Sequence, residues 1–255
     1  MEERKTTIIA LVGKGGVGKT SISAITVRLL KEKYPTKRIL AIDADPAIGL
    51  ATALGVEVGA TVDDIRKLFI QNVEEGNQQA AIEILSEAKY RMVDALVQNN
   101  NISFLAIGRP ESAGCYCKVN AYLKEVINYI SNNFDYVVID GEAGIEQVNR
   151  RVMEKVSHLV LVSDASKKGL QVVKTIHNVA KELVMFEKSG LIINRMVDIS
   201  YLNSLDIGEL ELLSCIEDDK KMSMSDMMGK NIFELDKDSP ILNKTKAALE
   251  RIGIL

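Results

Sequence analysis

Short apolar runs alternate along the chain with longer stretches in which apolar residues recur every three or four positions. The short runs are rich in β-branched residues, and several are apolar on both faces, as expected for central strands of a covered parallel sheet. The longer stretches have the period of helices with one buried face. The pattern predicts strands at 6–13, 38–43, 102–108, 136–140, 158–164, 189–194 and 211–216, and helices at 20–33, 119–131, 145–156, 166–187 and 240–252.

This alternation of strands and helices predicts an α/β fold with a doubly wound, mainly parallel sheet of about seven strands and helices on both faces. We expect residues 1–255 to form a single domain, with a charged helical insertion at about 61–99. Functional residues of such sheets lie in the loops that follow the carboxyl ends of the strands. The motifs described below fall at that edge.

The composition argues against several classes of partner. A net charge of −3 over 255 residues offers no general surface for nucleic acid or for an anionic membrane. In addition, no apolar run is long enough to span a bilayer. From the charge and the apolar runs together, we expect neither a nucleic-acid partner nor a membrane partner. Three cysteines provide no disulfide framework, which favours a reducing, cytoplasmic compartment.

The segment "LVGKGGVGKT" contains a phosphate-binding loop. Gly13, Gly18, Lys19 and Thr20 satisfy the pattern G-x-x-x-x-G-K-[ST] between a predicted strand and a predicted helix. Glycines let backbone N–H groups turn toward phosphate oxygens, and the helix N-terminus adds partial positive charge. Lys19 is expected to reach the β- and γ-phosphates, and the Thr20 hydroxyl to hold Mg²⁺. The other predicted nucleotide-binding residues of the loop are Gly15, Gly16, Val17 and Ser21.

A second lysine, Lys14, lies at the start of this loop. The string "KGGVGKT" resembles the deviant Walker A signature of the MinD/NifH/ParA-like class of P-loop ATPases. The resemblance implies that the protein binds ATP and ADP with Mg²⁺ and hydrolyses ATP. It also implies that Lys14 crosses a homodimer interface to touch the nucleotide of the other subunit. The alternative is that Lys14 is only an exposed charge of the loop.

Three aspartates lie at predicted strand ends: Asp43 and Asp45 in "AIDADP", and Asp140 in "YVVID". Carboxylates beside a phosphate-bound Mg²⁺ can orient the attacking water and hold the metal's own waters. The resemblance implies that Asp45 orients water, that Asp43 and Asp140 contact Mg²⁺ through water, and that the Gly144 N–H contacts the γ-phosphate. Glu142 departs from the common form of this segment. Taken singly, each aspartate is equally explained as a cap or turn residue.

Asn194 and Arg195 end the predicted strand "GLIIN" and begin the loop after it. An amide offers both a donor and an acceptor to the edge of adenine. The resemblance implies that Asn194 contacts the base, and we group Arg195 with it as nucleotide-binding. The alternative is a turn asparagine at the end of a strand.

Cys115 and Cys117 form a C-x-C pair in the loop after the strand "ISFLAIG". Two neighbouring thiolates suit a soft metal, but they complete only half of a tetrahedral site. In a symmetric dimer a pair near the two-fold axis meets its own copy, so two chains provide four sulfurs. Small buried side chains and a redox pair are the alternatives.

The string "AGCYC", followed by a helix and "VVIDGEAGIEQ", resembles the CooC-type ATPase family. Members of that family assist nickel insertion into carbon monoxide dehydrogenase. The resemblance implies a homodimer with nickel or zinc at the C-x-C site and an apo carbon monoxide dehydrogenase, or a related nickel enzyme, as the client. The rivals are a positioning ATPase of the MinD or ParA kind and a NifH-type iron–sulfur electron donor. The segment "GEAGIEQVN" contains no cysteine, which tells against the iron–sulfur protein.

The remaining reactive side chains are expected to be structural. Cys215 falls in a predicted strand, and His158 and His177 have no partner motif. The methionines of 221–230 are expected to form an adaptable packing surface.

Overall fold

The computed structural model describes residues 6–99, 101–109, 117–142, 148, 152 and 155–255. Their strands form one sheet in the order β3-β4-β2-β5-β1-β6-β7-β8, and only β3 and β4 pair antiparallel. The central strand β1 therefore lies where the chain moves from one half of the sheet to the other. The strands are β1 (Thr7–Gly13), β2 (Ile39–Asp43), β3 (Val97–Asn99), β4 (Ile102–Ala106), β5 (Tyr136–Asp140), β6 (Lys155–Ser163), β7 (Met185–Met196) and β8 (Leu212–Glu217).

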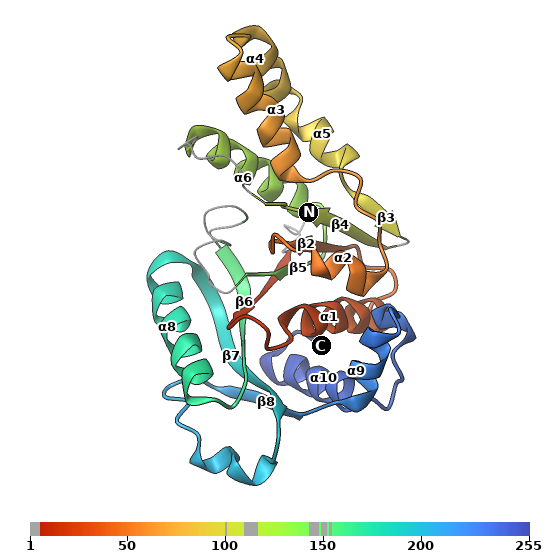
Figure 1. Cartoon of the computed structure of the whole chain (residues 1–255), viewed down its shortest axis with the longest axis vertical. Helices are drawn as coiled ribbons and strands as arrows, with labels where there is room; N and C mark the ends of the chain where they lie inside the picture. The colour runs from red at the N-terminus through yellow and green to blue at the C-terminus, as the bar shows by residue number, and fades with distance from the viewer. Residues whose placement is uncertain (1–5, 100, 110–116, 143–147, 149–151, 153–154) are drawn as a thin grey trace, which may run out of the picture.

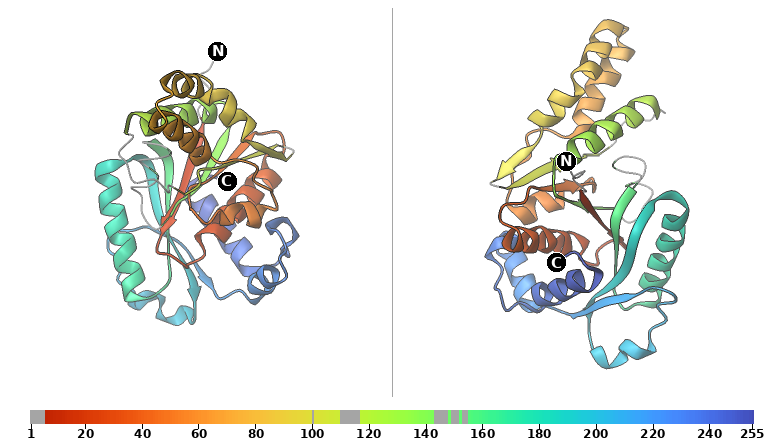
Figure 2. Two further views of the ribbon diagram at one scale, coloured as in Figure 1. Left: turned by 45° about the horizontal axis from the view of Figure 1, so that its top comes forward. Right: turned by 180° about the vertical axis from the view of Figure 1, so that it is seen from behind.

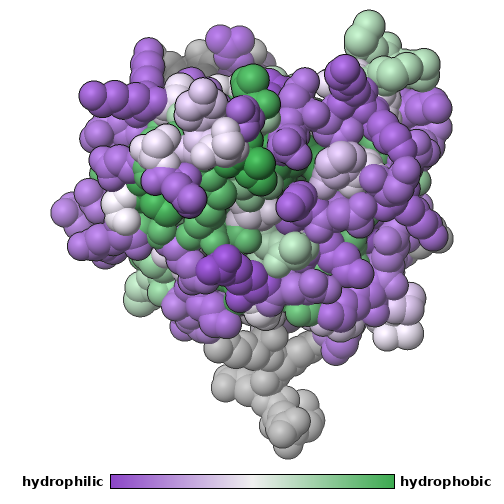
Figure 3. Space-filling model, turned by 90° about the horizontal axis from the view of Figure 1, so that it is seen from below, coloured by the Kyte–Doolittle hydropathy of each residue, from purple (hydrophilic) through white to green (hydrophobic). Residues whose placement is uncertain are grey.

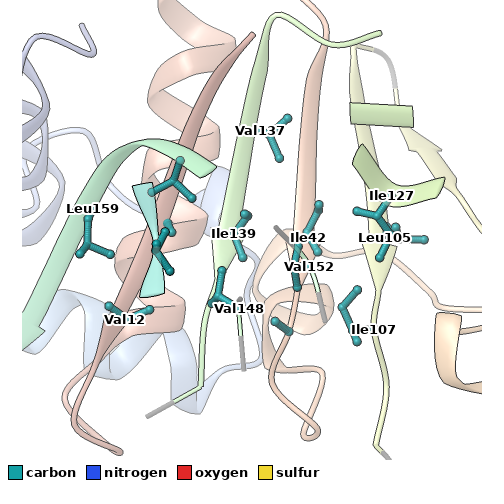
Figure 4. Close-up of a cluster of buried hydrophobic side chains, with 14 of the residues drawn as sticks. Val12, Ile42, Leu105, Ile107, Ile127, Val137, Ile139, Val148, Val152 and Leu159 are labelled. Atoms are coloured by element: carbon teal, nitrogen blue, oxygen red, sulfur yellow. The ribbon is translucent and has the colours of Figure 1, made fainter. Parts of the chain in front are cut away.

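Both faces of the sheet are buried because successive residues of each central strand point to opposite sides. Ala10 and Val12 belong to one apolar cluster, and Ile9 and Leu11 belong to the other. Figure 4 shows Val12 beside residues of neighbouring strands, including Ile139, in the first cluster. The two-sided apolar runs of the sequence are thereby explained.

Different helices cover the two faces, as Figures 1 and 2 show. The cluster with Val12 is covered by α6 (Cys117–Ser131) and α8 (Lys167–Leu183). The cluster with Leu11 is covered by α1 (Lys19–Lys33), α2 (Gly49–Leu54) and α10 (Pro240–Ile252). The short elements η1 (Ile199–Ser204), α9 (Lys220–Met227) and η2 (Ile232–Glu234) complete the C-terminal part. None of the helices in the described residues is long and apolar enough to cross a bilayer.

The insertion forms three helices, α3 (Val62–Glu74), α4 (Gln78–Ser86) and α5 (Ala88–Asp94), which rise above the sheet in Figure 1. Helix α3 begins with a capping box: Thr61 Oγ1 accepts from the Asp64 N–H at 3.2 Å, and Asp64 Oδ2 accepts from the Thr61 N–H at 2.9 Å. The insertion is anchored because Met92 and its neighbours pack in the same apolar cluster as α6.

The α/β class and the mainly parallel, two-sided sheet are confirmed, but the structure differs from the prediction most in the following places. The sheet has an eighth strand, β3, inside the segment expected to be helical. The helix expected at 166–187 ends at Leu183, and β7 begins at Met185 because that residue pairs with Lys155 of β6. Lys155 and Val156, expected at the end of a helix at 145–156, belong to β6. Most of that predicted helix lies outside the described residues.

Candidate functional site

The phosphate loop joins the end of β1 at Gly13 to the start of α1 at Lys19. Gly16 and Gly18 have φ angles of 78° and 91°, in the left-handed region that favours glycine. A Cβ atom at Gly18 would lie 2.6 Å from Asn194 Nδ2. Position 18 therefore requires glycine both for its backbone conformation and for its contact with β7.

The end of β7 holds the loop through two side chains. Asn194 Nδ2 donates to the Val17 carbonyl at 2.8 Å, and Arg195 Nη1 donates to the Gly16 carbonyl at 2.8 Å. Asn194 is buried, whereas Arg195 is exposed and has a φ angle of 57°, which is uncommon for a residue with a side chain. The sequence placed both residues at the nucleotide but did not predict these contacts with the loop's backbone. They fix the loop from the opposite half of the sheet.

Lys19 is buried, and its Nζ donates to the Lys14 carbonyl at 3.1 Å. Burial lowers the pKa of Lys19 more than the carboxylates of Asp140, Asp45 and Glu142 raise it. A hollow of about 410 Å³ opens beside this amine. Its lining residues are Gly15, Gly16, Gly18, Lys19, Thr20, Asp45, Glu142 and Arg195. The structure thus brings Asp45 and Glu142 together with the loop.

Asp43 and Asp140 end neighbouring strands behind this hollow and are both buried. Asp43 accepts from the Asp45 N–H at 3.0 Å and from the Leu50 N–H at 2.8 Å. Burial, and then the charge of Asp140, raises the pKa of Asp43 to about 7. The Asp45 side chain accepts from the Ala47 N–H at 2.9 Å, so the loop after β2 is ordered by its own carboxylates.

Asp140 Oδ1 accepts from the Ser23 hydroxyl of α1 at 2.9 Å. Its other oxygen, Oδ2, is buried and accepts no geometrically complete hydrogen bond within the described residues. Burial raises the pKa of Asp140 to about 6, opposed by the nearby hydroxyls of Thr20 and Ser23 and by Lys19. A hydroxyl beside a carboxylate with a free buried oxygen is an oxygen donor set that fits Mg²⁺. The described residues contain no group of three or more His, Cys, Asp or Glu that could hold a metal ion.

A second, smaller hollow of about 50 Å³ lies between the loop and the C-terminal segment. Gly18, Ser21, Asn194 and Arg195 line one side of it. The other side comes from the end of β8 and from α9 and α10: Asp218, Asp219, Met222, Ser223, Asp226 and Ile241. The position of α9 beside the phosphate loop was not predicted, because no short motif links the two segments.

Lys14 lies at the edge of the loop, and its Nζ forms an ion pair with Asp164 Oδ2 at 2.8 Å. The two side chains are 29% and 31% exposed. Asp164 follows the end of β6, next to β1, and was not among the predicted site residues. Its position after a strand at this edge is the signal that could have identified it.

Two predicted site residues, Cys115 and Gly144, lie outside the described residues. Cys117 is the first residue of α6. Cys215 is buried in β8, as expected for a structural cysteine. His158 and His177 are buried as well, and His177 Nε2 lies 3.1 Å from the Ser189 hydroxyl. Of the methionines expected to form a packing surface, Met222 packs partly buried against the cluster with Leu11. Met224, Met227 and Met228 are instead 56%, 88% and 63% exposed.

Comparison with known proteins identifies the class of this site. A family model described as an AAA domain, AAA_31, matches residues 5–192. The chain belongs to this family. An uncharacterized ATP-binding protein of Methanocaldococcus jannaschii is 34% identical over 250 residues, which are 96% of this chain and 98% of the relative. The carbon monoxide dehydrogenase accessory protein CooC of Rhodospirillum rubrum is 29% identical over 263 residues, which are 96% of this chain and 97% of the relative.

The fold of this AAA_31 protein is similar to that of MinD from Pyrococcus horikoshii, solved in complex with Mg-ADP. The TM-score is 0.68 at 21% identity, over 98% of this chain and 96% of the solved chain. The protein is therefore a P-loop ATPase of the AAA_31 family with a MinD-like α/β fold.

Proposed function

We propose that this ATPase is a nucleotide-switched homodimer that carries a soft metal and assists nickel insertion into carbon monoxide dehydrogenase or a related nickel enzyme. The similarity to CooC over nearly the full length of both chains, together with the C-x-C pair Cys115 and Cys117, supports the proposal. Nickel is the cargo here, although a site of paired thiolates accepts zinc as readily.

At the nucleotide, the loop from Gly13 to Ser21 surrounds the phosphates with backbone N–H groups, and Lys19 neutralises their charge. The Thr20 hydroxyl would hold Mg²⁺, with Asp43 and Asp140 contacting its waters. Held there, the metal would supply positive charge to the phosphates. Asp45 would orient the attacking water, since its carboxylate lines the hollow beside the loop.

Gly144 and the end of β7 complete the proposed nucleotide site. Gly144 would donate its N–H to the γ-phosphate. Asn194 and Arg195 would contact the nucleotide from the end of β7, where both already touch the loop. ADP and ATP would differ in whether the γ-phosphate draws in Lys14 of the partner and the segment around Gly144.

The dimer is proposed to form through the carboxyl edge of the sheet. Lys14 follows β1 at this edge, and η1 follows β7 at the same edge. Val197 and Tyr201 there are 96% and 64% exposed. Figure 3, seen from the end of the molecule where η1 lies, shows hydrophobic side chains gathered in one area among hydrophilic ones. An exposed apolar area supports burial against another protein surface.

The metal site is proposed to lie on the dimer axis. Cys117 is the first residue of α6 and so stands where the connection from β4 ends. Because β4 runs parallel to β2, and β2 to β5, this connection leaves from the same edge of the sheet as the phosphate loop. Two chains would then supply four thiolates, a complete tetrahedral set.

Metal analysis of anaerobically purified protein tests this proposal. The parent is expected to hold one nickel or zinc ion per dimer, and the double variant Cys115→Ala, Cys117→Ala is expected to hold none while still binding MgADP. Cys215→Ala is the matched control, since Cys215 lies in β8 away from the pair and should leave metal binding unchanged. Retention of one metal ion per dimer by the double variant would refute the assignment.

The second candidate is a positioning ATPase of the MinD or ParA kind, and the MinD-like fold favours it. Sedimentation with anionic vesicles or with duplex DNA, each with ATP present, separates the two candidates. The metallochaperone should remain in the supernatant in both cases. In α10, Ile241, Leu242, Leu249 and Ile252 are buried in the fold, so this helix offers no free apolar face to a membrane.

A further inference from the structure

We propose that Asp164 is a positioning residue: it holds Lys14 within its own subunit and must release it before two subunits can close around ATP. This inference rests on the proposed nucleotide-dependent homodimer. In addition, the Asp164 carboxylate would compete with the partner's nucleotide for Lys14. This competition would set the ATP concentration at which the dimer closes. The observation that carries it is the ion pair between Lys14 Nζ and Asp164 Oδ2 at 2.8 Å.

The carboxylate of Asp164 is fixed in place by the start of α8. Its Oδ1 atom accepts from both the N–H, at 3.2 Å, and the hydroxyl, at 2.5 Å, of Ser166. Ser166 is itself the N-cap of α8, and its hydroxyl accepts from the Gly169 N–H at 3.0 Å. One oxygen thus holds the carboxylate to the fold, and the other is left to pair with Lys14.

Gly169 provides the space for this arrangement. A Cβ atom at that position would lie 2.1 Å from Asp164 Oδ1, so any side chain there would displace the carboxylate. Burial raises the pKa of Asp164, but the hydrogen bonds from Lys14 and Ser166 outweigh it and hold the pKa below its ordinary value. The carboxylate is therefore ionised at neutral pH and available as an anion for Lys14.

A single ammonium group cannot pair fully with Asp164 and also reach the phosphates of a neighbouring subunit. The Lys14 side chain is 29% exposed, so it is accessible to a competing anion. A triphosphate carries more negative charge than one carboxylate and can outcompete it once the partner approaches. ADP lacks the γ-phosphate, and the pair with Asp164 is then expected to persist.

The test measures the ATP-analogue concentration that gives half-maximal dimer, by light scattering with a non-hydrolysable analogue and Mg²⁺. Asp164→Asn should lower this concentration, because an amide holds an ammonium group less strongly. A partly exposed ion pair of this kind corresponds to about a two- to five-fold effect per protomer. Two pairs open per dimer, so the dimer dissociation constant should fall by about the square of that factor. MgADP binding by the monomer should not change.

Two further variants make the result specific to this pair. Asp164→Glu keeps the charge and should return the threshold toward that of the parent. Glu211→Gln is the control, because Glu211 Oε1 also pairs with a basic side chain, Arg251 Nε, at 3.2 Å. Glu211 directly precedes β8, so it lies at the amino-terminal edge of the parallel sheet, away from the phosphate loop and from η1. That variant should leave the threshold unchanged.

Unchanged or weakened dimerisation of Asp164→Asn would overturn the inference, as would an equal shift in Glu211→Gln. Failure of the proposed dimer gives a different result. In that case Lys14→Ala and the parent would show the same degree of dimerisation with the analogue. If Lys14→Ala abolishes the dimer while Asp164→Asn has no effect, only the role of Asp164 is refuted.

Discussion

Asp43 and Asp140 are register partners at the ends of β2 and β5, and both carboxyl groups are buried beside the phosphate loop. Burial, and then the charge of Asp140, raises the pKa of Asp43 to about 7. Burial raises the pKa of Asp140 to about 6, with a smaller contribution from the charge of Asp45. Burial also lowers the pKa of Lys19, the cation that faces them. Burial therefore disfavours the charged form of all three side chains. A bound Mg²⁺ would add positive charge beside the two carboxylates.

The first prediction is that MgADP binding releases protons near pH 6.5. At that pH a fraction of Asp43 and Asp140 is protonated, and a dication beside them lowers both pKa values. Calorimetry in buffers of different ionisation enthalpy, with saturating Mg²⁺, should show release of about half a proton to one proton. Release should disappear at pH 8.5, where both groups are already ionised. Equal binding enthalpies in all buffers at pH 6.5 would contradict this account.

The second prediction concerns Asp140→Asn in the protein without nucleotide. The amide can still accept from the Ser23 hydroxyl, and its Nδ2 takes the place of the oxygen that has no hydrogen bond. A raised native pKa costs stability above that pKa and costs nothing below the unfolded value. The variant should therefore be more stable than the parent at pH 8, by about 1–2 kcal/mol, and equally stable near pH 4.

Urea unfolding at both pH values measures this difference. The same variant should lose most of the stabilisation that the parent gains from MgADP, because the neutral amide cannot support the cation. A variant that is less stable at pH 8, or that keeps full MgADP stabilisation, would show that the carboxylate is not poised for a metal.

The third prediction compares two asparagines that donate to backbone carbonyls. Asn194 is buried and donates to Val17 at 2.8 Å, whereas Asn101 donates to Lys37 at 2.9 Å in an exposed position. Asn194→Asp places a carboxylate against a carbonyl and should cost about 2–3 kcal/mol, together with at least tenfold in nucleotide affinity. Asn101→Asp should cost less than about 1 kcal/mol because water solvates the exposed charge. Similar losses in both variants would mean that burial at the loop is unimportant.

The spacing of hydrophobic residues along the chain predicts those strands and helices that are long enough to show a repeating pattern. Ile9 and Ala10 lie on opposite faces of a buried strand, and their run is apolar throughout, so the central sheet could be predicted. The strand Val97–Asn99 has three residues, too few to show a period, and it exists because β4 offers an edge. Met185 follows an uninterrupted helical pattern and becomes a strand residue because β6 pairs with it. In both cases, pairing with a neighbouring strand of the sheet determines the secondary structure.

The residues of the candidate site likewise fall into those that the sequence could predict and those that depend on the packing of the fold. Asp43 and Asp140 could be assigned to the phosphate loop from the sequence, because both end predicted parallel strands and functional residues lie at that edge of such sheets. Ser23 was missed because it resembles any other polar helix residue, and only the fold brings it to Asp140. Met222 was treated as a packing residue, and its place beside Gly18 depends on more than two hundred intervening residues. Contacts between distant segments of the chain are set by packing, which no local pattern records.

The last prediction concerns Gly18→Ala, with Gly59→Ala as its control. Gly18 has a φ angle of 91°, and an added Cβ would lie 2.6 Å from Asn194 Nδ2. An alanine there must strain the backbone and push Asn194 away from Val17, so both the loop and its support on β7 change. We expect a loss of about 2 kcal/mol in unfolding free energy. Nucleotide binding should fall below detection, since the phosphate-facing N–H groups are no longer aligned.

At Gly59 an added Cβ meets no atom within 4 Å, and the backbone is not in the left-handed region. Gly59→Ala should therefore keep the parent's stability or gain a few tenths of a kcal/mol from the reduced freedom of the unfolded chain. Thermal unfolding and calorimetric titration with MgADP measure both variants under the same conditions. Wild-type MgADP affinity in Gly18→Ala would mean that the loop tolerates displacement from Asn194. The support of the phosphate loop by β7 would then have no part in nucleotide binding.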